Sequence, residues 1–522
     1  MQTNAQLHRT QAMTRWLAGA SALAMIAIMH LSRLFWGARV LSHYDDDFFF
    51  YLKTAINFDQ LGRSTFDTIH LTNGYHPLWF IVIAALYRIA GTHFFQVFEV
   101  MQCALSALTY LYFRKLLLQF STNDLLIESL SLAILCFTLI FNRGGMEISL
   151  CIPLAVAMLV FRMRMGEAAS RKSVALYGLL ASLTVLARLD SAILVALLLA
   201  GDIWRQRQSA RRFVLSFSIG GLLVPAYVLS NRIWFGVWMP ISGQAKQLRL
   251  HHWPAMGIPR SVFAATSPQI FFMVWLACVL AVWSGFWLRR TTLTPRVKHM
   301  LVAMLLFTPA HILLLSIMSD WIIWSWYLYT LCFIYLAFGI LLCHYYSARA
   351  VRGLPLLLWA ECALLIGYVC VAVVAHRYHR QQLYDEDISL AAFINANPGL
   401  YAIGDRGGLL SYMITSPILQ TEGLVMDKEF LDVLQRQEDL STVLHRYGVK
   451  FYITPIADRG NGCSQAMEPA QAGPDSPKLK TIVCNHDAIF SPRPGDFEEI
   501  IPIERLPGRA TDPLSHDMSI RR

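Results

Sequence analysis

Long apolar runs separated by short polar stretches fill the first 376 residues of the chain. A membrane-spanning helix needs about 20 mainly apolar residues. The pattern predicts an all-α polytopic membrane module with about 11 transmembrane helices. The predicted spans are Trp16–Trp36, Phe94–Phe113, Leu125–Phe141, Met146–Phe161, Val174–Ala187, Ile193–Trp204, Phe213–Phe235, Val262–Leu288, His299–Met318, Tyr327–Tyr346 and Leu354–His376.

The first run has two interpretations. Basic residues precede Trp16–Trp36, as they do in a secretory signal peptide. The run is long for the apolar core of a signal peptide, however, and no small-residue cleavage site follows it. We therefore predict an uncleaved first span, with a cytoplasmic N-terminus and with Asp45 on the outer side of the membrane.

The run from Pro77 to Ala90 decides the topology of everything after it. It is only about two-thirds of a span long. If it crosses the membrane, the later basic loops alternate between the two sides. If it lies in the outer interface, within a first outer loop over residues 37–93, all of these loops fall on the cytoplasmic side, as Lys and Arg usually do. We therefore predict an interfacial helix over residues 77–90.

The last part of the chain, residues 377–522, has a different pattern. Charged and turn residues become frequent, and short helix-like and strand-like segments alternate as in small βα units. We predict an extracytoplasmic α/β domain that ends in an irregular Pro- and Gly-rich tail from Asp458. The expected elements are helices over Ile388–Ala396, Glu429–Gln435 and Leu440–Tyr447, with strands over Leu400–Gly404 and Val449–Thr454.

Composition supports this division and excludes several classes of protein. Hydrophobic residues make up 56% of the chain and charged residues 15%, where a soluble domain has about 25% charged residues. This excludes a water-soluble enzyme and a nucleic-acid-binding domain. Cys463 and Cys484 lie in polar sequence, where an outer compartment favours a disulfide. Two free thiols are the alternative.

Three consecutive carboxylates stand directly after the first span. Asp45, Asp46 and Asp47 precede the aromatic run Phe48–Tyr51. Crowded carboxylates raise one another's pKa, and such a group also suits a divalent cation. The alternative is a solvated start to the loop. Because ionisable groups are costly near a bilayer, we interpret the triplet as catalytic.

Two further polar groups are expected at outer turns. Glu147 follows a pair of glycines and would stand at the mouth of a span. It is either a second functional acid or a carboxylate favoured by the dipole of the helix that it begins. Arg188 and Asp190 interrupt an apolar stretch, and they form either a structural pair or part of a catalytic site.

The outer loop that begins at Gly236 carries cations on the side of the membrane where they are unusual. Lys246 and Arg249 are the main examples. An anionic lipid phosphate would explain them, and ordinary headgroup contact is the alternative. The aromatic stretch Trp321–Tyr329 either stacks on a sugar or belongs to an interfacial aromatic belt.

Several of these segments together resemble the GT-C superfamily of polytopic glycosyltransferases. The resemblance is strongest to bacterial members similar to the mycobacterial terminal arabinofuranosyltransferase, and it runs from Asp45 to about Thr454. Each motif is weak alone, but their order along the chain is specific. The matching segments are Asp46–Lys53, Thr72–Trp79, Gly145–Glu147, Arg188–Asp190, Pro240–Lys246, Ile403–Tyr412 and Glu422–Leu424. Asp45 is an extra acid that departs from the usual pair.

The resemblance implies an inverting transfer of a sugar from a polyprenyl-phosphate donor. It gives Asp46 the role of general base, with Asp47, Asp45 and Glu147 as further catalytic acids. Asp46, Asp47 and Glu147 would hold Mg²⁺, Mn²⁺ or Ca²⁺ if a metal takes part. The residues expected to bind the donor phosphate are Lys246, Arg249, Arg188 and His76. Those expected to bind substrate are Tyr75, Asp190, Gln244, Trp326 and Tyr327.

The resemblance also implies a place and a set of partners. We expect a protein of the bacterial inner membrane with its C-terminal domain in the periplasm. The acceptor would be a cell-envelope glycan, a lipid or a protein such as a pilin, and no nucleic acid is expected. Two alternatives stay open: a transporter or flippase for lipid-linked sugars, and a ligase or polymerase of the O-antigen type. A transporter should show internal repeats or acids in the middle of spans, and we find neither in the sequence.

Overall fold

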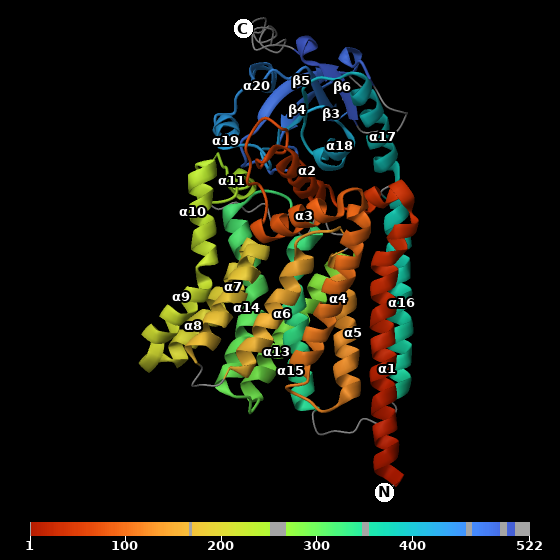
Figure 1. Ribbon diagram of the computed structural model, residues 1–522, viewed down its shortest axis with the longest axis vertical. Helices are drawn as coiled ribbons and strands as arrows, with labels where there is room; N and C mark the ends of the chain where they lie inside the picture. The colour runs from red at the N-terminus through yellow and green to blue at the C-terminus, as the bar shows by residue number, and fades with distance from the viewer. Residues whose placement is uncertain are drawn as a thin grey trace, which may run out of the picture.

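A long helical body carries a small α/β domain at one end (Figure 1). The computed structural model describes residues 2–142, 144–165, 170–250, 268–346, 354–379, 381–455, 462–490 and 498–506. The N-terminal helix starts at the far end of the body (Figure 1). We call the α/β domain the outer domain.

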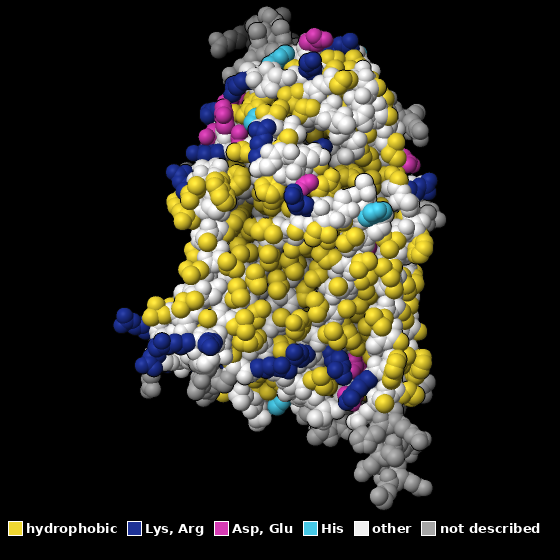
Figure 2. Space-filling view, in the orientation of Figure 1, with side chains coloured by type: hydrophobic (Ala, Val, Ile, Leu, Met, Phe, Trp, Pro, Cys, Tyr) yellow, Lys and Arg dark blue, Asp and Glu magenta, His cyan; other side chains and the backbone are white. Residues whose placement is uncertain are grey.

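The body consists of helices that run roughly along its long axis (Figure 1). On the face shown in Figure 2, apolar side chains cover the middle of the body. Among the described residues, seven helical segments are long and apolar enough to cross a membrane, or eight if the α9–α10 pair, bent by 51°, is one span. The body helices are α1 (Gln2–His30), α4 (Phe94–Leu117), α5 (Asp124–Phe141), α6 (Ile148–Arg164), α7 (Arg171–Ala187), α8 (Ala192–Arg205), α9 (Ala210–Gly221), α10 (Leu223–Phe235), α13 (Pro268–Arg290), α14 (Pro295–Met318), α15 (Leu331–Tyr345) and α16 (Leu354–His379).

The mostly helical membrane body matches the fold class predicted from the sequence, but the count of eleven spans stays a prediction. Three helices of the count, α6, α7 and α8, have 17, 17 and 14 residues. These are shorter than the roughly 20 residues that cross a bilayer unaided. The predicted span that begins at Val262 also starts outside the described residues, since α13 begins at Pro268.

Helix α3 occupies Pro77–Ala90, the range expected for the short interfacial helix. A proline at its first position favours the start of the helix, because proline there sacrifices no backbone hydrogen bond. Gly91, with φ of 52°, ends it. The helix lies across the outer ends of the body helices, beneath the outer domain (Figure 1). Its depth in the membrane stays a prediction.

A buried polar network joins the first span to α4. Glu99 of α4 is fully buried. One of its oxygens accepts from Arg33 at 3.0 Å and from the Tyr44 hydroxyl at 2.5 Å, and the other lies 3.1 Å from His30. Removing one member would leave buried polar groups unpaired, which is costly. The network therefore fixes Tyr44, the residue just before the acidic triplet.

Basic residues gather at the end of the body opposite to the outer domain (Figure 2). They close the last turns of the helices that run away from that domain. Examples are Lys115 in α4, Arg164 in α6, Arg205 in α8 and Arg290 in α13. This distribution is the one from which the sequence predicts a cytoplasmic face.

The outer domain is built on a four-stranded sheet in the order β2-β1-β3-β6. The first three strands pair in parallel, as the alternating βα pattern predicted. They are β1 (Tyr401–Ile403), β2 (Ile418–Gln420) and β3 (Phe451–Pro455), with helices α17 (Gln381–Ala396), α18 (Gly407–Met413), α19 (Lys428–Gln435) and α20 (Leu440–Arg446). Parallel strands bring their carboxyl ends to one edge of the sheet, where ligands usually bind.

The expectation of an irregular tail from Asp458 is wrong. Asp458 itself lies outside the described residues, but β4 (Cys463–Glu468) and β5 (Leu479–Cys484) form an antiparallel hairpin. Strand β6 (Glu498–Pro502) then pairs antiparallel with β3. The Pro and Gly content of this segment masked the hairpin in the sequence, and β6 depends on the more distant strand β3. Cys463 and Cys484 face each other in the hairpin and are joined by a disulfide.

The interfacial placement of α3 can be tested by labelling cysteines. Thr92, in the short helix that follows α3, and Thr292, between α13 and α14, are both exposed. We expect a membrane-impermeant maleimide added to intact spheroplasts to label Thr92→Cys and to spare Thr292→Cys until the membrane is opened. Labelling of native thiols in the unmodified protein is subtracted. Protection of Thr92→Cys in sealed cells would contradict the topology.

Candidate active site at the junction of the body and the outer domain

The acidic triplet and the glycine turn before Glu147 meet in space. Asp45 precedes α2 (Asp46–Leu61), and its backbone N–H donates to the Gly144 carbonyl at 3.0 Å. A Cβ on Gly144 would lie 1.7 Å from the Asp45 carboxylate, so only glycine fits there. Two segments that are about 100 residues apart in the chain thus form one surface beneath the outer domain.

Asp46 binds the outer domain. Its two carboxylate oxygens accept the backbone N–H groups of Gly408 at 2.9 Å and Leu409 at 2.8 Å, at the start of α18. In nucleotide-binding βα units a phosphate occupies such a position. Here a carboxylate of the body occupies it. Burial raises the pKa of Asp46 to about 6, against the lowering effect of the two backbone hydrogen bonds.

Asp47 and Lys246 form the centre of the junction. Burial raises the pKa of Asp47 to about 7, the Lys246 ammonium lowers it, and Asp46, Asp45 and Glu147 raise it further. Lys246 donates to the Tyr327 hydroxyl at 2.9 Å. Burial disfavours its charge, but Tyr327 and Asp47 nevertheless hold the pKa of Lys246 above its ordinary value. The site therefore combines a weak acid that titrates near neutrality with a permanent cation.

Arg188 links the two other predicted acids. It is 1% exposed, and its guanidinium contacts both Glu147 and Asp190, the latter at 3.0 Å. The rings of Tyr327 and Tyr329 each lie 4.8 Å from it. The charge of Arg188 is therefore compensated by two carboxylates, and the choice between a structural and a catalytic role for the Arg–Asp pair stays a prediction. The cluster also supports Tyr327, the partner of Lys246.

His76 and His311 complete this support. His311 contacts Asp190 at 3.0 Å, and the Tyr329 hydroxyl donates to Asp190 at 2.7 Å. His76 accepts the Leu189 backbone N–H on Nδ1 at 3.2 Å. Its proton therefore sits on Nε2, which lies 3.7 Å from Glu147. His76 thus lies beside the Arg188 cluster. The binding of the donor phosphate by His76, which the sequence analysis expected, stays a prediction.

Four predicted site residues have their own partners outside this centre. The Arg249 guanidinium donates to the Ile317 carbonyl at the end of α14. The Gln244 amide donates to the Met239 carbonyl at 2.7 Å. The Tyr75 hydroxyl pairs with Ser64, and Trp326 stacks on Trp324. In the part of the chain that the structure describes, none of these four side chains is found in contact with the Lys246 ammonium, and their substrate roles stay predictions.

Two of the three acids expected to hold a metal, should one take part, have other partners. Both oxygens of Asp46 accept backbone N–H groups. Glu147 contacts Arg188 with one oxygen and accepts from the Tyr51 hydroxyl with the other, at 3.3 Å. These hydrogen bonds and ion pairs leave few carboxylate oxygens for a cation, since Mg²⁺ and Ca²⁺ are coordinated by about six or more oxygen ligands. We propose no metal at this site.

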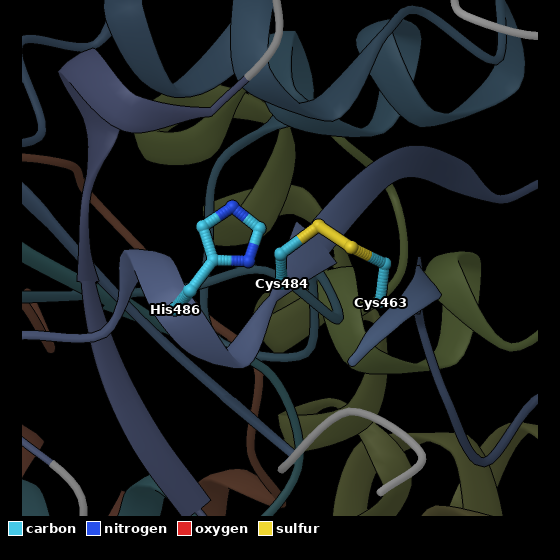
Figure 3. Close-up of side chains that lie close together, drawn as sticks. All are labelled: Cys463, Cys484 and His486. Carbon is cyan, nitrogen blue, oxygen red and sulfur yellow. A yellow bond between two sulfur atoms is a disulfide. The ribbon is translucent and has the colours of Figure 1, made fainter. Parts of the chain in front are cut away.

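Within the described residues, one group of three metal-type ligands comes together elsewhere. Cys463, Cys484 and His486 lie close to one another in the outer domain (Figure 3). The two sulfurs are joined in the disulfide and are therefore not thiolates. Metal binding by cysteine needs the thiolate. In this oxidised form the group is a cross-link of the β4–β5 hairpin.

Several ionisable residues of the junction had no role in the sequence analysis. Asp405 follows β1 and Glu422 follows β2, so both lie at the carboxyl edge of the four-stranded sheet. Glu468 ends β4, and the electrostatic neighbours of Glu422 include Asp405, Glu468 and Asp47. Glu422 is 3% and Glu468 is 2% exposed. Glu422 was quoted only as part of a motif. The sequence signal that could have identified these acids is their position after strands, because ligands bind at the carboxyl ends of parallel strands.

A second group of carboxylates surrounds Arg406, just before α18. The Arg406 guanidinium contacts Glu386 at 3.2 Å, Glu498 at 3.7 Å and Asp387 at 3.8 Å. Burial raises the pKa of Glu498 to about 8, because one guanidinium does not compensate three buried carboxylates. Arg406 thereby orients the turn whose amides hold Asp46.

The chain is similar in fold to the solved protein ArnT, which supports the fold that the motifs predicted. No protein-family model and no curated protein matches it. Among solved structures it resembles ArnT from Cupriavidus metallidurans bound to undecaprenyl phosphate, with a TM-score of 0.53, 12% identity and coverage of 92% of this chain and 99% of that one. Arabinosyltransferase EmbB from Mycobacterium smegmatis matches with a TM-score of 0.39 and 12% identity, over 88% of this chain and 46% of that one. The apolar helices and this fold make the chain a membrane protein.

The contact of Asp46 with α18 predicts a stability effect that can be measured. In Asp46→Asn the side-chain NH₂ group would face one of the two backbone N–H groups of α18, so that one hydrogen bond is lost and a donor opposes a donor. We expect the free energy of unfolding to fall by about 1–3 kcal/mol. Asp59→Asn, on the same helix, is the control, because its pair with Arg88 lies at the surface. That control should change stability by less than about 1 kcal/mol. Thermal unfolding in nanodiscs measures both, and equal effects would contradict the assignment.

Proposed function

We propose that the chain is an inverting membrane glycosyltransferase that moves a sugar from a polyprenyl-phosphate donor to an extracytoplasmic acceptor. The observation that carries this proposal is the pair formed by Asp47 and Lys246. A carboxyl whose pKa is about 7 lies near a buried ammonium, at the junction of the membrane body and the outer domain. The fold is shared with ArnT, whose structure contains undecaprenyl phosphate.

Lys246 is the residue best suited to the donor phosphate. It has three N–H donors, and the structure gives one of them to Tyr327. Arg188 has its charge compensated by Glu147 and Asp190. We therefore assign the phosphate contact to Lys246 and give Arg188 the task of holding Tyr327. A fixed cation is worth most when charge grows on the departing oxygen.

The geometry favours Asp47 over Asp46 as the general base, which changes the assignment implied by the family resemblance. Both Asp46 oxygens are engaged by α18, whereas Asp47 lies near Lys246, the phosphate ligand. Asp47 takes the proton of the acceptor hydroxyl as its oxygen bonds to the anomeric carbon. The bond from that carbon to the phosphate oxygen breaks, and its electron pair leaves with the lipid phosphate. Such base catalysis contributes about 10²–10⁴-fold.

The position of the site supports an acceptor on the outer side. The basic helix ends at the opposite side of the body favour a cytoplasmic location for that side, by the usual bias of Lys and Arg. The junction then faces the periplasm of a bacterial inner membrane. We propose an envelope glycan, lipid or protein as acceptor, since each can reach this side with a hydroxyl group.

The proposal predicts different defects for the two central residues. In nanodiscs with a panel of polyprenyl-phosphate sugars, we expect Asp47→Asn to bind donor and to lose about 10²-fold or more in kcat. Lys246→Met should weaken donor binding itself. Glu429→Gln, an exposed acid in α19, is the control and should behave as wild type. If no donor is turned over and lipid-linked sugar instead crosses a sealed vesicle, the chain is a flippase.

The base assignment also predicts a pH profile. A general base works only when it is ionised, and the pKa of Asp47 is about 7. We expect kcat/KM to fall about tenfold per pH unit as the pH is lowered below this value. The residual activity of Asp47→Asn should lack this limb. If the acid limb persists unchanged in that variant, another group is the base.

A further inference from the structure

Lys246 stands where three segments meet. It directly follows α11 (Ile241–Ala245), whose first N–H donates to the Asn73 side chain at 3.0 Å. The next residue, Gly74, packs on the Leu424 carbonyl so closely that a Cβ would lie 1.9 Å from it. The first outer loop therefore holds both Lys246 and the turn that carries Glu422. The electrostatic neighbours of Glu422 include Lys246 and Asp47.

Glu422 is a buried carboxyl with little to compensate a charge. It is 3% exposed, and one of its oxygens accepts the Gln420 side-chain N–H at 2.9 Å. The other oxygen has no hydrogen-bond partner, and no ion pair within 4 Å is found for Glu422 among the described residues. An ionised carboxylate with one neutral donor is expensive to bury. Burial is also the main reason that the pKa of Glu422 is well above its usual range.

The charges around Glu422 add to this cost. Asp405 and Glu468 from the outer domain and Asp47 from α2 each disfavour a negative charge on it, and Lys246 alone favours one. With both Asp47 and Glu422 ionised, Lys246 would stand between two anions. A donor phosphate would then meet a net negative site. With Glu422 neutral, Lys246 balances Asp47, and the carboxyl O–H becomes a hydrogen-bond donor.

We propose that Glu422 serves as a neutral carboxylic acid, and that its proton is what allows Lys246 to bind the phosphate of the donor while Asp47 stays ionised. Glu422 is thus a positioning residue that the outer domain contributes to the phosphate site. The inference rests on the proposed function, because it takes a lipid phosphate as the ligand. It gives the outer domain a part in donor binding in addition to covering the site.

The proposal fixes the sign of a pH dependence. The phosphate binds best when Glu422 is protonated, so the bound state has the higher pKa for this group. Affinity is then constant at low pH and falls once the pH exceeds the pKa of Glu422 in the free protein. The loss reaches about tenfold per pH unit. Asp47 would add a similar loss near its own pKa of about 7, so the test removes its charge.

The experiment measures equilibrium binding of decaprenyl methyl phosphate to the full chain in nanodiscs from about pH 6 to about pH 9.5. This phosphodiester has one negative charge throughout, and Lys246 keeps its charge because its pKa lies above the ordinary lysine value of about 10.4. Three proteins are compared: Asp47→Asn, Asp47→Asn with Glu422→Gln, and Asp47→Asn with Glu429→Gln. The last is matched, because Glu429 is an exposed acid of the same domain.

We expect the first and third proteins to lose affinity as the pH rises and the Glu422→Gln protein to keep its low-pH affinity throughout. An alkaline loss that survives Glu422→Gln would overturn the proposal and point to Asp405 or Glu468. Affinity independent of pH in Asp47→Asn would also overturn it while leaving the proposed function intact. Absence of binding by wild type at every pH would instead reject the lipid-phosphate donor.

A second measurement covers the case in which Glu422→Gln fails to fold. Calorimetry of the same ligand with Asp47→Asn, in two buffers of different ionisation enthalpy, gives the protons taken up on binding. In the alkaline limb we expect about one proton per ligand. No uptake there contradicts the proposal without use of the variant.

Discussion

The contact of the Asp46 carboxylate with the first amides of α18 joins the membrane body to the outer domain. Asp46 is the first residue of α2, and α18 follows the central strand β1. A helix start offers unpaired N–H groups, and a carboxylate satisfies them with a charge of the favoured sign. Because Asp47 is the next residue of α2, the same contact sets where the proposed base stands relative to the carboxyl edge of the sheet.

The position of the junction creates a surplus of negative charge. The carboxyl ends of β1 and β2 supply Asp405 and Glu422, β4 supplies Glu468, and α2 supplies more acids. The described cations near these acids include Lys246, Arg188 and Arg406. Two of these have ion pairs with carboxylates of their own. Protons must therefore supply part of the compensation, which explains why acids of this region titrate near neutrality. For a site that handles a phosphate, such protons keep the cation available.

Rigidity around the cation comes from uncharged contacts as much as from ion pairs. Tyr327 bonds to Lys246 and also covers the face of Arg188. Asn73 and Gly74 hold the α11 start and the Leu424 carbonyl. Glu99 fixes Tyr44 from within the body. A transferase needs its charges fixed before the reaction begins, since reorganising them would raise the barrier.

The sequence by itself determined the membrane body, the short helix over 77–90 and the parallel βα start of the outer domain, because apolar periodicity and turn residues act locally. It also picked out Asp46, Asp47, Glu147, Arg188 and Lys246 as the polar groups worth explaining, because charges beside a bilayer are costly. The β4–β5 hairpin escaped it because of the Pro and Gly residues in this part of the chain, and β6 because its partner β3 lies more than 40 residues earlier. Only the tertiary structure decided which acid is bound to α18, which cation is compensated and which remains for a ligand, and that Glu422 lies near Lys246. Those properties depend on distances between segments hundreds of residues apart, on which local sequence has no bearing.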